Sequence, residues 1–155
     1  MASINRQSYL KDIQAARKQL ERISETQASS PLEPGHWAPK QILGHLIDSA
    51  ANNHQRFVRA QEVEFLDFPS YNQTHWVEAA GYKNIEWPVL VALWANYNLL
   101  LANIIAHIPE QKLGVICTAY WNKPPRDRLR LDELIDGYFE HLNHHVDQLL
   151  ALVKN

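Results

Sequence analysis

The chain has 155 residues, of which 46% are apolar and 21% are charged, values that exclude a disordered chain and a fibrous repeat. Fifteen Lys and Arg against seventeen Asp and Glu give a net charge of −2, which argues against nucleic acid and against an anionic membrane surface as partners. The single cysteine, the lack of an apolar run long enough to span a membrane and the lack of a signal-peptide pattern predict one cytoplasmic domain over residues 1–155.

Two amphipathic helices are predicted in the first 60 residues. Apolar residues recur at spacings of three and four over residues 3–26, with Ser3 as a candidate N-cap. A turn-rich stretch over residues 28–35 ends this helix. The second helix is predicted over residues 38–60, because Pro39 suits a first helical turn and apolar residues follow at helical spacing.

The next segment is a long connection with a weak pattern. Residues 61–86 contain proline, asparagine and glycine breaks, and a short helix is predicted over residues 72–80. A third long helix is predicted over residues 87–108, again with a proline in its first turn and with a proline just after its end.

The C-terminal part combines an irregular segment with a fourth long helix. Residues 110–130 include two adjacent prolines and are predicted to be irregular, with a short extended piece over residues 115–118. The fourth helix is predicted over residues 131–152 and carries acidic residues in its first turn, where they favour the helix dipole. Four long amphipathic helices predict an all-α four-helix bundle with a long, partly helical connection between helices 2 and 3.

Three of the eight histidines form a candidate metal site. His141 and His145 are four residues apart on one helix face, with Cβ atoms about 5–6 Å apart, and they continue an apolar stripe that faces the bundle core. Buried imidazoles need polar partners, and a divalent ion is one of them. His45 is the best third ligand, and Asp48, one turn on, could orient a ligand imidazole or act as a base. The alternative is that these are core histidines with ordinary hydrogen-bond partners.

The remaining candidate ligands have simpler interpretations. His144 points about 100° away from His145 around the helix and is predicted to face solvent or an interface. Cys117 is interpreted as a small apolar residue rather than as a fourth ligand. The other four histidines are predicted to lie at the surface: His36, His54, His75 and His107.

Two separated motifs resemble a known family. Residues 35–48 (GHWAPKQILGHLID), continued by 49–57, are similar to the tryptophan-to-histidine segment of the DinB-like superfamily, in particular its YfiT-like branch. Residues 140–148 (EHLNHHVDQ) resemble the second histidine motif of that family. The resemblance implies a four-helix bundle that often dimerises. It also implies a divalent metal held by three histidines, which fall on His45, His141 and His145.

The family contains transferases that use low-molecular-weight thiols such as bacillithiol, and a mycothiol-dependent isomerase. The resemblance therefore favours a metal-dependent transferase that activates a small thiol toward a small electrophile, with Zn, Ni or Fe as the metal. A metal-dependent hydrolase, with Asp48 or His75 as base, and a non-catalytic metal-binding stress or scaffold protein are the alternatives. A homodimer is expected in each case.

The sequence evidence for substrate-binding residues is weaker than the evidence for the metal ligands. Arg56 could hold an anionic group of the thiol, although a solvated or interface ion pair is the preferred interpretation. Four aromatic residues in irregular segments could line a pocket or simply close the end of the bundle: Tyr71, Trp76, Tyr120 and Trp121.

Overall fold

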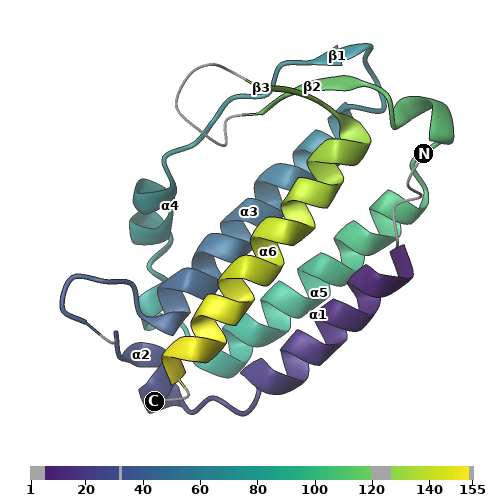
Figure 1. Ribbon diagram of the computed structural model, residues 1–155. Coiled ribbons are helices and arrows are strands. Elements are labelled where there is room, and N and C mark those ends of the chain that lie inside the picture. The colour runs from purple at the N-terminus through teal and green to yellow at the C-terminus, as the bar shows by residue number, and fades with distance from the viewer. Residues whose placement is uncertain (1–5, 32, 120–126, 154–155) are drawn as a thin grey trace.

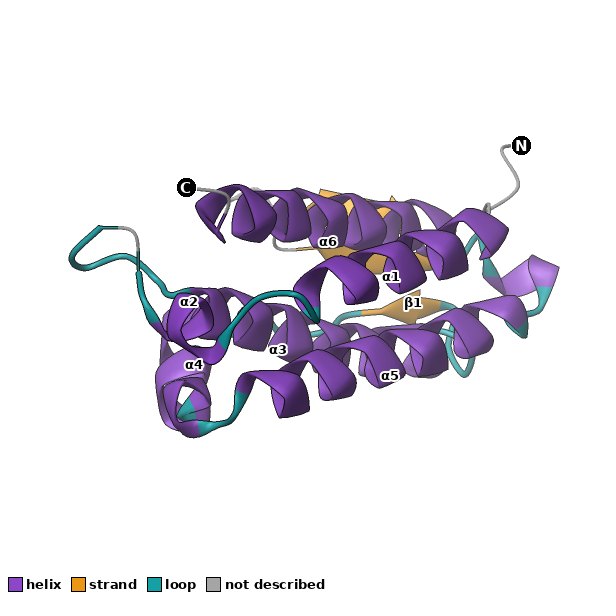
Figure 2. Ribbon diagram, turned by 90° about the horizontal axis from the view of Figure 1, so that it is seen from below, coloured by secondary structure: helices purple, strands orange, loops and turns teal. Residues whose placement is uncertain are grey.

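Four long helices form the body of the molecule, and the computed structural model describes residues 6–31, 33–119 and 127–153 (Figure 1). The helices are α1 (Arg6–Leu20), α3 (Pro39–Arg59), α5 (Trp87–Ala106) and α6 (Leu131–Val153). Each packs against two of the others, and Figure 2 shows α1 with α6 in one layer and α3 with α5 in the other. The predicted four-helix bundle is confirmed.

The long connection explains the order of directions in the bundle. In Figure 1, α1 and α6 run toward one end of the bundle, and α3 and α5 run toward the other. Two consecutive helices can be parallel only if the chain returns along the bundle between them. The segment after α3 makes this return, and it ends in the short helix α4 (Gln73–Ala80) and the 3-10 turn Tyr82–Asn84 just before α5 begins.

The first predicted helix is too long and is in fact two helices. The helix α1 ends at Leu20, and α2 (Glu25–Ser29) starts again with Ser24 as its N-cap. The Ser24 hydroxyl accepts from the backbone N–H of Gln27, whose side chain accepts in return from the N–H of Ser24. This capping box stabilises a new helix start near the C-terminal end of the predicted helix. The predicted cap at Ser3 lies outside the described residues.

The short helix α2 also joins two longer helices. The carboxylate of Glu25 contacts the ammonium group of Lys40 and accepts a hydrogen bond of 2.8 Å from the backbone N–H of Trp87. Lys40 lies in the first turn of α3 and Trp87 is the first residue of α5. One acidic side chain therefore compensates a buried cation and an otherwise unpaired N–H group at a helix start.

The central helix α3 has the bounds that the sequence predicts, with Ala38 and Ala60 as its caps. It packs against α5, α6, α2 and α4, and nearly all of its first half is buried. This burial takes several polar side chains into the interior: Lys40, Gln41, His45, Asp48, Ser49, Asn52, Asn53 and Arg56. Such a concentration of buried polar groups on one helix marks it as the element that carries a site.

A small sheet covers one end of the bundle and was only partly predicted. The strands β1 (Phe65–Leu66), β2 (Ile116–Ala119) and β3 (Asp127–Arg130) lie in that order, with β1 parallel and β3 antiparallel to β2. The extended piece predicted near residues 115–118 corresponds to β2. The other two strands were missed because β1 has only two residues and β3 contains three charged residues, so neither has a strand pattern.

The helix α5 corrects the expectation that no segment could span a membrane. Its 20 residues, Trp87–Ala106, are long and apolar enough to cross a membrane by length and composition. In the bundle, however, 44% of its most apolar window is buried against other helices, and the core helices of soluble proteins pass the same test. Packing in the core accounts for part of the apolar composition of α5, while Val89, Leu93 and Leu100 are exposed.

A buried hydrogen bond between α5 and α6 leads to a stability prediction. The Tyr138 hydroxyl donates to Oδ1 of Asn98 at 2.6 Å, and the Asn98 amide donates to the carbonyl of Trp94. Both residues are at most 1% exposed. Tyr138→Phe leaves the Asn98 oxygen buried without its donor and should lower the free energy of unfolding by about 1–3 kcal/mol in urea denaturation. Adding Asn98→Leu should recover part of the loss, and a further loss of the same size would contradict this account.

Candidate metal centre

Three imidazoles meet between the two neighbouring helices α3 and α6. The Nε2 atoms of His45 and His141 are 3.3 Å apart, and one ligand atom of each of the three histidines lies within 4.8 Å of the others. Two nitrogens that share a tetrahedral zinc-type ion at about 2.0–2.1 Å are about 3.3–3.4 Å apart. The spacing of His45 and His141 therefore fits a common metal ion, and His145 lies within reach of the same point.

The helix register explains why the three rings converge. His141 and His145 are one turn apart on α6, and their ring centroids are 4.6 Å apart. His45, from α3, is 5.2 Å from the first ring and 5.1 Å from the second, at nearly perpendicular angles to both. His45 is 2% exposed, whereas the two rings of α6 are half-buried. One side of the cluster is therefore sealed by the bundle, and the other is accessible.

The environment keeps all three imidazoles neutral. Burial is the main cause that lowers the pKa of His45 to about 4 and that of His141 to about 4, and the neighbouring histidines add to the effect. Burial also lowers the pKa of His145. Because only a neutral imidazole has a lone pair for a metal, the cluster is ready to bind a cation at neutral pH.

Gln148 fixes the orientation of one candidate ligand, and sequence reasoning did not assign it this role. Its Oε1 lies 2.8 Å from Nδ1 of His145, so Nδ1–H donates and Nε2 keeps its lone pair. The signal was present in the sequence, because residues three apart on a helix are neighbours. Nδ1 of His45 is buried and has no hydrogen-bond partner among the described residues.

The lowered pKa values predict how the stability of the metal-free protein depends on pH. In the unfolded chain these imidazoles bind a proton near their ordinary pKa of 6.5, but in the folded state His45 and His141 bind one only near 4. The unfolded state therefore binds more protons below pH 6.5. As the pH is lowered from 6.5 toward 4, the free energy of unfolding should fall by up to about 1.4 kcal/mol per pH unit for each group. Urea denaturation of chelator-treated protein between pH 7 and pH 5 measures this slope.

The pH dependence of stability is tested with the variant His141→Gln, and His75→Gln is its control. The first removes one of the buried groups and should make the pH dependence shallower. The second changes an exposed histidine on α4 and should leave the slope unchanged. Equal slopes in wild type and His141→Gln would show that the buried imidazole does not control the pH dependence.

Asp48 is three residues from His45 in the sequence, but its hydrogen-bond partner is Tyr82. The Tyr82 hydroxyl donates to Oδ1 of Asp48 at 2.6 Å, and Oδ2 is buried without a hydrogen-bond partner among the described residues. Burial raises the pKa of this carboxyl group. No described hydrogen bond joins Asp48 to an imidazole, so its role as an orienting group or base stays a prediction.

Of the other candidate residues, Arg56 lies farther along α3, Tyr71 lies just before α4 and Trp76 lies on α4. Arg56 is 8% exposed, with its guanidinium 5.0 Å from the centre of the Phe68 ring, so it is not a solvated side chain, and the alternative of an interface ion pair stays a prediction. Tyr71 is half-buried and its side chain is hydrogen-bonded to Ser49. Burial raises the pKa of Tyr71 to about 12. Its ring lies 5.1 Å from that of Trp76, which is 39% exposed. Tyr120 and Trp121 lie outside the described residues.

Of the histidines expected at the surface, one is placed differently. His54 is half-buried, and its Nδ1 lies 3.2 Å from the hydroxyl of Tyr97 on α5. It faces the bundle because α3 is covered on several sides. The other residues of this group are exposed, as predicted: His36, His75, His107 and His144. Cys117 is completely buried in the sheet, which agrees with its interpretation as a small apolar residue.

Fold and site together define a four-helix-bundle protein with a three-histidine centre between two of its helices. The model of the DinB superfamily matches residues 9–149, and the chain belongs to this superfamily. Among its relatives is the proposed metal-dependent hydrolase YfiT of Bacillus subtilis (strain 168), which is 22% identical over 94% of this chain and 80% of its own length. A proposed metal-dependent hydrolase of Bacillus pumilus is 22% identical over 86% of this chain and 74% of its own length.

Two solved structures have the same fold. The structure of YfiT from Bacillus subtilis, described as an unusual four-helix bundle, matches with a TM-score of 0.81 and 19% identity over 99% of this chain and 90% of that chain. A mycothiol-dependent maleylpyruvate isomerase matches with a TM-score of 0.70 and 12% identity over 97% of this chain and 61% of that chain. The predicted YfiT-like architecture is confirmed.

Proposed function

We propose that this protein is a metal-dependent enzyme in which His45, His141 and His145 hold one divalent ion. The observation that carries the proposal is the 3.3 Å separation of the His45 and His141 Nε2 atoms, with His145 in the same cluster and all three rings neutral. Three imidazoles suit Zn, Ni or Fe. When bound, such an ion would lower the pKa of a thiol or of water and so supply a nucleophile at neutral pH.

The leading form of the proposal is a transferase that joins a low-molecular-weight thiol to a small electrophile. The mycothiol-dependent enzyme with the same fold supports it. The composition of the site supports it too, because no carboxylate of the described residues belongs to the ligand cluster and could serve there as a base for water. A thiol has a much lower pKa than water and needs less help from a base.

Arg56 can take part only at a distance. It lies 11 residues after His45 on α3, which is about 16 Å along a helix axis at a rise of 1.5 Å per residue. Only the far end of an extended thiol molecule would reach it. Its burial over Phe68 favours a role in holding the segment after α3. Tyr71 lies nearer to the histidines, because its side chain is hydrogen-bonded to Ser49, one turn after His45 on α3, and Trp76 packs against Tyr71.

The second candidate function is a metal-dependent hydrolase, which the names of the relatives favour. The two functions separate on whether turnover needs a thiol. We expect metal-loaded protein to accelerate the reaction of bacillithiol or cysteine with 1-chloro-2,4-dinitrobenzene, and His141→Ala to lose this effect. Hydrolysis of 4-nitrophenyl acetate without thiol would instead favour the hydrolase. Metal binding without either activity would favour a stress or scaffold protein.

The homodimer expected for the family is a separate proposal. Light scattering of the metal-loaded protein on a size-exclusion column tests it directly. A mass near twice 17.9 kDa would support the dimer, and a mass near 17.9 kDa would contradict it.

A further inference from the structure

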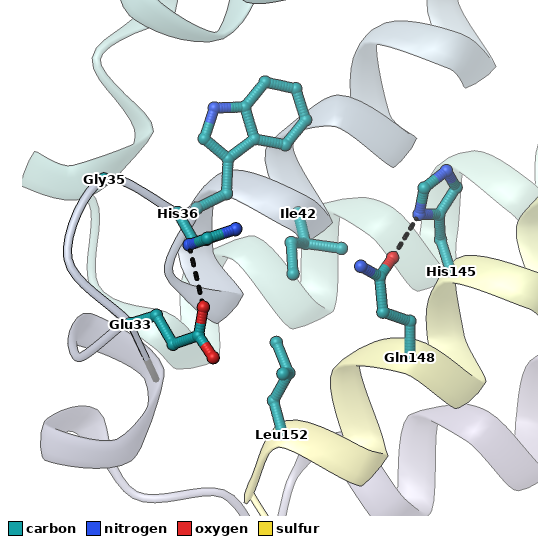
Figure 3. A pocket seen from close by; sticks show the side chains of 8 residues that line it. Glu33, Gly35, His36, Ile42, His145, Gln148 and Leu152 are labelled. Atoms are coloured by element: carbon teal, nitrogen blue, oxygen red, sulfur yellow. Dashed lines mark hydrogen bonds and ion pairs between the residues drawn. The ribbon is translucent and has the colours of Figure 1, made fainter.

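A cavity of about 490 Å³ opens beside the metal ligand His145 (Figure 3). It lies between the loop before α3, the first turn of α3 and the C-terminal end of α6. Trp37, Ile42 and Leu152 form its apolar walls, and His145 and Gln148 lie along one side. Its volume is within the range of about 300–1,000 Å³ that is usual for small-molecule sites.

The walls of the cavity select for uncharged groups. In Figure 3, Ile42 and Leu152 face the space between the loop and α6, and the Gln148 amide is turned toward His145, with which it makes its hydrogen bond. Among the described lining residues, Glu33 is the one Asp, Glu, Lys or Arg; it lies at the mouth, 3.5 Å from His36, and both side chains are more than two-thirds exposed. A buried anion would find no compensating cation on these walls, and its desolvation would be costly.

The cavity adjoins the metal centre through two residues. His145 belongs to both the lining and the ligand cluster. Trp37 lines the cavity, and its ring centroid is 5.6 Å from that of His45, the ligand on the other helix. A molecule bound against the accessible side of the cluster therefore has an apolar space of suitable size next to its reactive group.

We propose that this cavity binds the uncharged apolar part of the substrate, an aromatic ring or a branched aliphatic group, while the reactive atom lies at the three-histidine centre. The inference rests on the proposed function and names the substrate class for it. It differs from the sequence-based expectation, which placed substrate contacts at Arg56, Tyr71, Trp76 and Trp121.

The test compares imidazole with 4-phenylimidazole as probes of cobalt-loaded protein, followed by the visible absorption bands of the metal. Both probes carry the same ligand nitrogen, so the ratio of their dissociation constants reports the phenyl group alone. We expect 4-phenylimidazole to bind about tenfold more tightly or better. A third probe, 4-(imidazol-4-yl)benzoate, should lose most of this gain, because it would place a carboxylate in the apolar cavity.

Three variants locate the effect. Trp37→Ala and Leu152→Asn should each lower the affinity ratio several-fold, whereas Leu93→Asn, on the exposed face of α5, should leave it unchanged. Circular dichroism checks the fold, and Leu152→Asn, close to the C-terminal end of α6, serves if Trp37→Ala does not fold.

The outcomes distinguish the two proposals. If imidazole changes the cobalt spectrum but 4-phenylimidazole binds no more tightly than imidazole, the cavity proposal is overturned while the metal centre stands. The same holds if 4-phenylimidazole gains equally over imidazole in wild type and in both cavity variants. If cobalt does not bind, or its spectrum does not respond to imidazole, the proposed function is overturned, and the cavity proposal with it.

Discussion

Replacing Gly44 with alanine is expected to lower the free energy of unfolding by about 3 kcal/mol, although alanine is the better helix former. A Cβ atom at this position would lie 2.1 Å from Cδ2 and 2.3 Å from Cγ of Tyr82. The Tyr82 ring is 7% exposed, and its hydroxyl is bonded to Asp48, so it cannot turn away freely. Urea denaturation of wild type and Gly44→Ala measures the effect.

The background variant Tyr82→Ala gives the control. Without the ring, the added methyl group has space, and Gly44→Ala should then stabilise the protein by roughly 0.5–1 kcal/mol through helix propensity. The sign of the effect should therefore reverse between the two backgrounds. Destabilisation of equal size in both would show that the close approach to Tyr82 is not its cause.

The second large effect concerns stabilisation by metal. A ligand that binds only the folded state stabilises it by about 2.7 kcal/mol at a free concentration one hundred times its dissociation constant. Wild-type protein should therefore unfold at a clearly higher temperature in the presence of Zn²⁺ or Ni²⁺ than with a chelator. His141→Ala should lose this shift, because two imidazoles remain and tight sites of this type use at least three protein ligands.

His144→Ala is the matched control for this experiment. His144 is on the same helix and next to His145, but it is exposed and lies outside the ligand cluster. Its removal should leave the metal-dependent shift nearly unchanged. A loss of the shift in His144→Ala equal to that in His141→Ala would mean that the stabilisation comes from metal bound at the surface of α6.

The features that could be predicted from sequence are those that local patterns control. The bounds of α3 and α6 follow from an early proline in one, acidic residues in the first turn of the other and long apolar periodicity in both. The pair His141 and His145 follows from the same periodicity. The choice of His45 as third ligand needed knowledge of which helices are neighbours, and the family resemblance supported it.

The features that could not be predicted depend on tertiary context. The break between α1 and α2 comes just before a capping box at Ser24 and Gln27, which starts a new short helix near the end of the predicted one. The burial of Arg56 results from the segment after α3, which folds back over it and places Phe68 under its guanidinium. The cavity beside His145 combines residues from the loop before α3 and the end of α6, far apart in sequence.

The central claim is that three histidines from two helices hold one metal ion. Elemental analysis of protein purified without an affinity tag or chelator, wild type beside His45→Ala, His141→Ala and His145→Ala, tests it most directly. We expect about one metal ion per chain in wild type and its loss in each variant that stays folded. Wild-type protein that contains no metal, even after incubation with Zn, Ni, Fe and Mn, would contradict the claim and make the three histidines polar groups of the bundle interior.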